Sequence, residues 1–132
     1  MSFLLDRDTC EHWIRGAQRV ANAAVQHQGR LHISAATVMA LELWLLHART
    51  PSRHLQGYGA ILQQVSVVII DEDVAHRAAS VGARLTGQMP RLTPIDLLVA
   101  ATALVHGLTL VTRDLQHYAR VPGLTIVDWL MP

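Results

Sequence analysis

Short apolar segments alternate along the chain with longer segments that have helical features. The short segments do not alternate polar with apolar positions, which is typical of strands that are covered on both faces. The pattern therefore predicts five buried strands, at Ser2–Leu5, Leu31–Ser34, Val65–Ile70, Leu108–Thr112 and Leu124–Val127.

Six helices are predicted between these strands. Ser34, Asp71 and Thr93 stand where N-caps are preferred, and after Thr93 come a proline and an acid, as in a strong helix start. Gly107 is expected to end that helix. Alternation of strands and helices favours an open, mostly parallel sheet with helices on both faces, which is the α/β class. The predicted helices are Thr9–Gly16, Ala17–Gln28, Ala35–Arg49, Ser52–Gln64, Glu72–Thr86 and Pro94–His106.

Length and composition restrict the class of protein. The 132 residues are 51% hydrophobic and 16% charged, which excludes disorder and predicts one domain over residues 1–132. The apolar run Leu97–Val105 is far shorter than the ~20 residues of a membrane-spanning helix. Asp6 and Asp8 interrupt the apolar N-terminus, so no signal peptide is expected. The lone Cys10 cannot form an internal disulfide, which favours a reducing cytoplasm.

The charge balance gives no strong field for nucleic acid or a membrane. Eleven basic and ten acidic residues leave a net charge of +1, and every basic residue is arginine, with no lysine. The apolar excess beside so few charges predicts that part of the apolar surface is covered by a partner.

Four aspartates are predicted to lie at one edge of the sheet. Asp6 follows the first strand, Asp71 the third and Asp114 the fourth, and Asp96 begins a helix that would open at the same edge. Ligands of open parallel sheets bind beyond the carboxyl ends of the strands. Converging carboxylates repel one another, and oxygen-only sites suit Mg²⁺ or Mn²⁺, which can activate water for phosphodiester cleavage.

Ordinary structural roles explain most of these acids as well. Asp71 is most simply an N-cap, and Asp8 could cap the first helix. Asp96 would be stable at a helix N-terminus and Asp114 in a turn, without any metal. Asp6 is the hardest to explain in this way, because a carboxylate at the end of a buried strand is costly without a partner.

Other catalytic motifs are not apparent in the sequence. The eight histidines are scattered, so we interpret them as surface or partly packed residues rather than zinc ligands. Cys10 has no evident base and is predicted to be packed rather than catalytic. Glycine-rich nucleotide loops and the G-x-S-x-G nucleophile motif are missing.

Four segments together resemble the PIN-domain ribonucleases, specifically the VapC toxins of bacterial type II toxin–antitoxin systems. The third of them is long and specific, whereas the others would be weak alone. The segments are FLLD at Phe3–Asp6, HISAAT at His32–Thr37, TPIDLLVAATALVHGLTLVTRD at Thr93–Asp114 and VPGLTIVDW at Val121–Trp129.

This resemblance implies a PIN-like three-layer fold and an acidic Mg²⁺ or Mn²⁺ site that cleaves RNA, with tRNA the common substrate class. Asp6 and Asp96 match metal-holding acids, and Asp114 matches an acid that completes the shell or orients water. The resemblance also implies a homodimer and a cognate VapB-type antitoxin that wraps the toxin and reaches its active site.

The chain departs from the family pattern at two positions. Ala40 stands where the family has a glutamate, three residues after Thr37, and Arg7 replaces a small hydroxyl residue. Glu42 lies about 200° around the helix from Ala40, so we interpret it as a surface charge paired with Arg49. We therefore expect a PIN fold with three of four acids and weakened or absent catalysis.

Two other interpretations remain. Haloacid-dehalogenase-like phosphatases and receiver domains also gather acids at strand ends, but they use a lysine there and this chain has none. Alternatively, the chain is a catalytically dead PIN-fold module that captures an antitoxin or RNA. Arginines could contact phosphates in such a module, although salt bridges explain them as readily. These arginines are Arg49, Arg53, Arg84, Arg91, Arg113 and Arg120.

Overall fold

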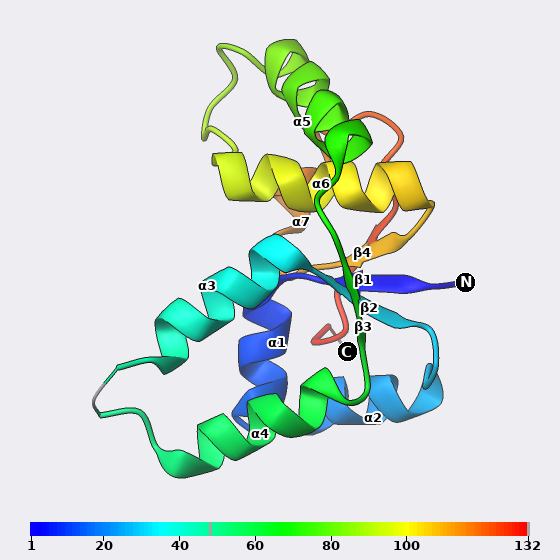
Figure 1. The fold of residues 1–132 in the computed structure, drawn as a ribbon. Helices are drawn as coiled ribbons and strands as arrows, with labels where there is room; N and C mark the ends of the chain where they lie inside the picture. The colour runs from blue at the N-terminus through cyan, green and yellow to red at the C-terminus, as the bar shows by residue number, and fades with distance from the viewer. Residues whose placement is uncertain (48, 132) are drawn as a thin grey trace.

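A computed structural model describes residues 1–47 and 49–131. Within these residues one five-stranded sheet is surrounded by seven helices, which confirms the α/β prediction (Figure 1). The strands are β1 (Phe3–Leu5), β2 (Leu31–Ser34), β3 (Ser66–Val68), β4 (Thr109–Val111) and β5 (Ile126–Val127). The helices are α1 (Arg7–Ile14), α2 (Gln18–Gln26), α3 (Ala35–Leu45), α4 (Ser52–Leu62), α5 (Glu72–Arg84), α6 (Pro94–His106) and α7 (Leu115–Tyr118).

The sheet has the strand order β3-β2-β1-β4-β5, and each pairing is parallel. From β1 the chain first builds outward through β2 and β3, and then returns to place β4 on the other side of β1. Leu5 at the end of β1 is opposite Val111 at the end of β4. The strand order thus reverses between β1 and β4, and open parallel sheets bind ligands at the carboxyl end of such a point.

Side chains of β1 alternate between two separate cores. Phe3 and Leu5 pack with residues of α1 to α4, whereas Leu4 packs with residues of α5, α6 and α7. Figure 1 shows α1 to α4 on one side of the sheet and α5 and α6 on the other. The predicted three layers are therefore present.

The start of α6 has the local structure that its sequence predicts. The Thr93 hydroxyl accepts a hydrogen bond from the Asp96 amide at 3.1 Å, and Asp96 Oδ2 accepts one from the Thr93 amide at 3.1 Å. This reciprocal capping box, with Pro94 at the first helical position, fixes where Asp96 lies. Gly107 ends the helix in the left-handed conformation, with φ 64°.

The structure corrects several predicted boundaries. The strand predicted at Val65–Ile70 pairs only at Ser66–Val68, and the prediction that it is covered on both faces is wrong. Because β3 lies at the edge of the sheet, Val67 is 46% exposed, whereas β1 and β4 are buried.

The helix predicted at 35–49 ends at Leu45, and residue 48 of that range lies outside the described residues. Helix α7 was not predicted, since four residues are too few to show a helical period. None of the helices in the described residues is long and apolar enough to cross a membrane.

Candidate active site

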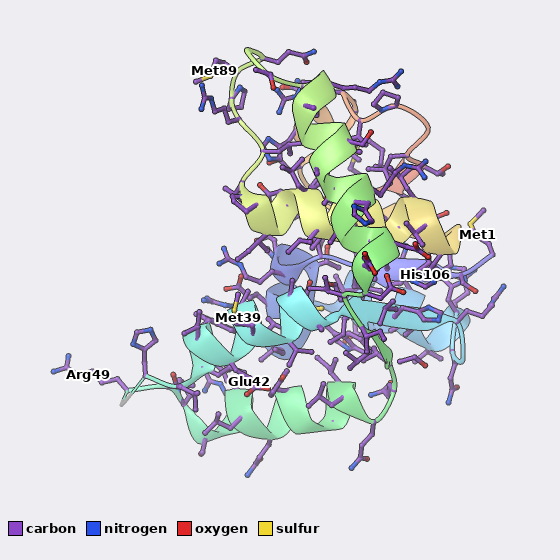
Figure 2. The ribbon with its side chains drawn as sticks, turned by 45° about the horizontal axis from the view of Figure 1, so that its top comes forward. Met1, Met39, Glu42, Arg49, Met89 and His106 are labelled. Carbon is purple, nitrogen blue, oxygen red and sulfur yellow. The ribbon has the colours of Figure 1, made fainter. Side chains whose placement is uncertain are left out.

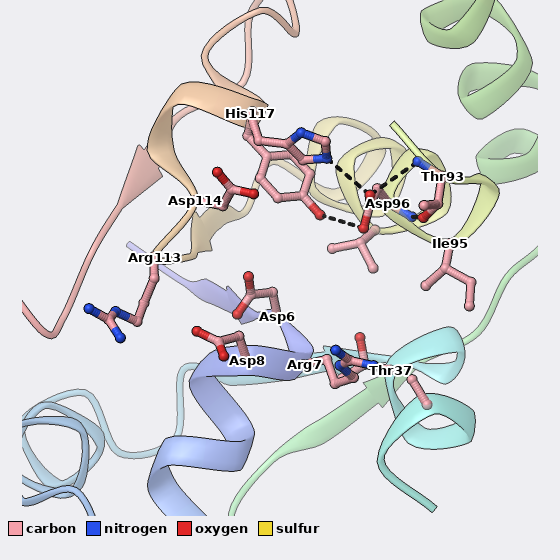
Figure 3. A pocket seen from close by; sticks show the side chains of 13 residues that line it. Asp6, Arg7, Asp8, Thr37, Thr93, Ile95, Asp96, Arg113, Asp114 and His117 are labelled. Carbon is pink, nitrogen blue, oxygen red and sulfur yellow. Dashed lines mark hydrogen bonds and ion pairs between the residues drawn. The ribbon is translucent and has the colours of Figure 1, made fainter. Parts of the chain in front are cut away.

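A cavity of about 720 Å³ opens where β1 and β4 end (Figure 3). All three predicted site residues, Asp6, Asp96 and Asp114, line it, although they come from three distant parts of the sequence. The other lining residues are Arg7, Asp8, Thr37, Ala40, Thr93, Ile95, Val99, Arg113, His117 and Tyr118.

Asp6 is both a wall of this cavity and the N-cap of α1. It is buried, and its Oδ1 accepts a hydrogen bond from the Thr9 amide at 2.9 Å. Burial raises the pKa of Asp6, while hydrogen bonds from Thr9 and Thr112 act in the opposite direction. Asp6 thus caps α1, a role that the sequence did not suggest for it. The prediction of Asp8 as the cap of this helix is wrong.

Asp96 is held by hydrogen bonds to both of its oxygens. Besides the Thr93 amide, Oδ2 contacts Nε2 of His117 at 3.0 Å, and Oδ1 accepts from the Tyr118 hydroxyl at 3.3 Å. Burial acts to raise the pKa of Asp96, but hydrogen bonds from His117 and Thr93 outweigh it and hold the pKa below its usual range. Two carboxyl groups of one cavity therefore have pKa shifts of opposite direction.

Like its neighbour Tyr118, His117 is a site residue that sequence reasoning missed. Its side chain is 12% exposed, it lines the cavity, and Nδ1 lies 3.4 Å from Arg120 Nη2. A guanidinium only donates, so this contact makes Nδ1 the acceptor and leaves the ring hydrogen on Nε2. That N–H donates a hydrogen bond to Asp96 Oδ2. The chain of contacts from Arg120 through His117 fixes the orientation of the Asp96 carboxylate.

Asp114 follows β4 and precedes α7. Its amide donates a hydrogen bond to the Thr112 hydroxyl at 3.0 Å, and its side chain does not cap α7. Figure 3 shows the carboxyl groups of Asp114 and Asp6 pointing into the same space. Asp114 is thus turned toward the cavity by the loop that ends β4, as its position after the strand predicts.

Helix α3 presents Ala40, and not Glu42, to the cavity. Thr37 and Ala40 lie one turn apart on the lining face. Glu42 is exposed, and Oε2 accepts a hydrogen bond from the Tyr58 hydroxyl at 2.7 Å. Figure 2 shows Glu42 in the space between α3 and α4. This placement agrees with the predicted rotation around the helix, but the partner is Tyr58 rather than Arg49.

The donor chemistry of the cavity fits a hard divalent cation. Its carboxylates are oxygen ligands, and Mg²⁺ is often held by only one or two of them while it keeps several waters. Asp6 and Asp114 point into the cavity, whereas both oxygens of Asp96 are engaged by neighbours. Within residues 1–47 and 49–131, no three His, Cys, Asp or Glu side chains form a group that could hold a metal.

Comparisons with known proteins identify this arrangement. The PIN domain family matches residues 5–124. The tRNA(fMet)-specific endonuclease VapC of Salmonella typhimurium is 27% identical over 130 residues, 98% of each chain. Ribonuclease VapC4 of Mycobacterium tuberculosis is 31% identical over 98 residues, 72% of this chain and 74% of its own.

Solved structures give the same result. The crystal structure of DNA-bound VapBC from Salmonella typhimurium contains a chain that superposes with a TM-score of 0.89 at 27% identity, with 98% of each chain covered. The acids lie at the strand switch point, where open α/β sheets bind ligands, and PIN-domain nucleases are typically metal-dependent. This chain belongs to the PIN-domain family, in its VapC branch of toxin endoribonucleases from VapBC toxin–antitoxin systems.

The hydrogen bonds to Asp96 predict a specific pH dependence of stability. Because its pKa is lower in the folded chain, Asp96 stabilises the fold above its unfolded pKa of about 3.9, and this is lost as the pH falls through the folded pKa. We expect Asp96→Asn to reduce the unfolding free energy by about 1 kcal/mol at pH 7. Urea unfolding at neutral pH and near pH 3 measures this, and the deficit should shrink at the lower pH. An equal deficit at both pH values would show that charge on Asp96 is irrelevant.

Proposed function

We propose that this chain is a Mg²⁺- or Mn²⁺-dependent endoribonuclease of weakened activity, with Asp6, Asp96 and Asp114 as its catalytic and metal-binding residues. The observation that carries the proposal is the cavity itself. The three acids lie between residues 6 and 114 of the sequence, yet they line one space, together with Asp8, at the switch point of a parallel sheet.

The substrate class and the setting are proposed from relatives. The 27% identical protein from Salmonella typhimurium is named a tRNA(fMet)-specific endonuclease, which supports tRNA as the substrate. Its structural counterpart is a DNA-bound VapBC complex, which supports a VapB-type antitoxin as partner. We further propose that residues 1–132 are a single domain, as the length of the chain suggests, and that it acts as a homodimer, as the family resemblance implies. The lone Cys10 favours the cytoplasm.

The three acids have different surroundings, which suggests different roles. Asp6 and Asp114 point into the cavity and would hold the cation directly. Asp96, oriented by His117, Thr93 and Tyr118, would hold the cation through water molecules. A bound cation would lower the pKa of water and stabilise the oxygens of the phosphodiester.

Ala40 accounts for the proposed weakness. It lines the cavity at the position where the family has a glutamate, and a methyl group can neither hold a cation nor orient water. Glu42 cannot replace that glutamate because it is bonded to Tyr58 on another face of α3. The cavity thus lacks a carboxylate on its α3 side.

Cleavage of total tRNA in Mg²⁺ tests the proposed function. We expect slow cleavage that EDTA abolishes and that Asp114→Asn reduces to background, because that change removes a carboxylate facing the cavity. Cleavage that survives in EDTA or in the variant would come from a contaminant or another site, and would contradict the assignment.

A pure binding module is the second candidate. The missing acid at Ala40 and the absence, in the described residues, of a compact group of metal ligands favour it. Tight binding of a VapB-type antitoxin together with no tRNA cleavage, even at stoichiometric protein and in Mn²⁺, would support this alternative.

A further inference from the structure

The α3 wall of the cavity contains an unsatisfied polar atom. Thr37 is 1% exposed and lines the cavity, and its Oγ1 has no hydrogen-bond partner in the part of the chain that the structure describes. Buried hydroxyl groups are nearly always hydrogen-bonded in folded proteins. An atom of this kind on a cavity wall indicates that a ligand supplies its partner.

The groups around Thr37 select the chemistry of that ligand. Ala40, one helical turn further along α3, adds only a methyl group, so α3 contributes no charge to the cavity. Arg7, from the first turn of α1, lines the same cavity as Thr37 (Figure 3). This side of the cavity therefore combines the positively charged guanidinium of Arg7 with the hydroxyl group of Thr37, which can donate a hydrogen bond.

The guanidinium of Arg7 has N–H donors that its ion pair with Glu11 does not use. Its Nε lies 3.1 Å from Glu11 Oε2, while the side chain as a whole is 59% exposed. One such ion pair engages only part of a group with five N–H donors. The planar fork of a guanidinium matches phosphate oxygens, and a threonine hydroxyl can donate to another oxygen of the same group.

We propose that Arg7 and Thr37 form a phosphate site that works without metal and holds a phosphate group of an RNA strand beside the aspartates. The inference rests on the proposed function for the kind of ligand, since the cavity is that of an endoribonuclease. It adds that substrate binding on the α1–α3 side needs no cation. The uncharged Ala40 permits this site, because a carboxylate at position 40 would lie one helical turn from Thr37 and would repel the phosphate.

RNA binding in EDTA tests this site. A fluorescently labelled single-stranded oligoribonucleotide is titrated with each variant, and binding is followed by anisotropy over a series of salt concentrations. We expect Arg7→Ser and Ala40→Glu to weaken binding by about tenfold, with the salt slope reduced by about one in Arg7→Ser. Arg84→Ser, the same charge change on an exposed residue of α5, is the matched control and should change affinity less than twofold. Equal affinity of the Arg7 and Arg84 variants would overturn the proposal.

Thr37→Val gives a second measurement that does not depend on Arg7. Since the hydroxyl has no partner in the protein, its removal should leave the melting temperature unchanged or higher, while RNA binding in EDTA weakens severalfold. A lower melting temperature would show that the hydroxyl is already satisfied within the fold, and would count against a ligand role.

Two further measurements distinguish the RNA phosphate site from a site for free phosphate and from the proposed nuclease function. Millimolar inorganic phosphate should displace little of the RNA; complete displacement would assign the site to free phosphate instead. Ala40→Glu should weaken RNA binding in EDTA yet increase cleavage in Mg²⁺, so the two readouts move in opposite directions. Failure of cleavage alone would contradict the proposed function, and unchanged binding in EDTA alone would contradict the phosphate site.

Discussion

Ala40→Glu is expected to increase Mg²⁺-dependent tRNA cleavage by about 100-fold, the scale on which single charge-stabilising groups act in active sites. The reason is the position of Ala40 on the face of α3 that lines the cavity. A glutamate there would add a fifth carboxylate to Asp6, Asp8, Asp96 and Asp114, because Ala40 is buried but lines the cavity wall. Initial rates on one tRNA substrate at saturating Mg²⁺ measure the effect.

Glu42→Gln is the matched control for this change. It removes a carboxylate from the same helix, two residues away, but from the side that contacts Tyr58. We expect its cleavage rate to equal that of the natural chain. If Ala40→Glu were no faster than the natural chain, the family's glutamate would have to lie elsewhere in this sequence.

Asp6→Asn is expected to abolish cleavage and, at the same time, to stabilise the protein. Burial raises the pKa of Asp6 in the folded chain. The fold is therefore more stable at low pH, where Asp6 is protonated, and it loses this stability as the pH rises through the folded pKa and Asp6 becomes ionised. Asparagine keeps the capping bond to Thr9 and carries no charge. We expect a gain of about 1 kcal/mol at neutral pH.

Thermal and urea unfolding at pH 7 measure this gain, and cleavage is best followed in the Ala40→Glu background, where the signal is large. Asp73→Asn serves as the control, because Asp73 is exposed in the first turn of α5, where a negative charge is favourable. The Asp73→Asn protein should be slightly less stable to unfolding and should cleave tRNA at an unchanged rate. A destabilised Asp6→Asn protein would show that the Asp6 carboxylate is stabilised in its charged form.

Local features that depend on neighbouring residues could be predicted from the sequence. The capping box before α6 needs only Thr93 and Asp96, and it places the acid at the cavity. The contrast between Ala40 and Glu42 follows from about 100° of rotation per residue. The convergence of Asp6 and Asp114 follows from the parallel sheet, in which strand ends share one edge.

Features that depend on long-range packing could not be predicted. His117 bonds to Asp96 across 21 residues, from a helix of four residues that has no periodicity to reveal it. Tyr58, the partner of Glu42, comes from the next helix. The exposure of Val67 depends on its strand being at the sheet edge, because an edge strand and a central strand can have the same apolar sequence.

Calorimetric titration with Mn²⁺ tests most directly whether Asp6, Asp96 and Asp114 form a cation site that lacks a carboxylate at position 40. The natural chain should bind Mn²⁺ weakly, Asp114→Asn should not bind it measurably, and Ala40→Glu should bind it at least about tenfold more tightly. Identical Mn²⁺ affinity in all three proteins would show that the cavity is not where the cation binds, and would contradict the assignment of Asp6, Asp96 and Asp114.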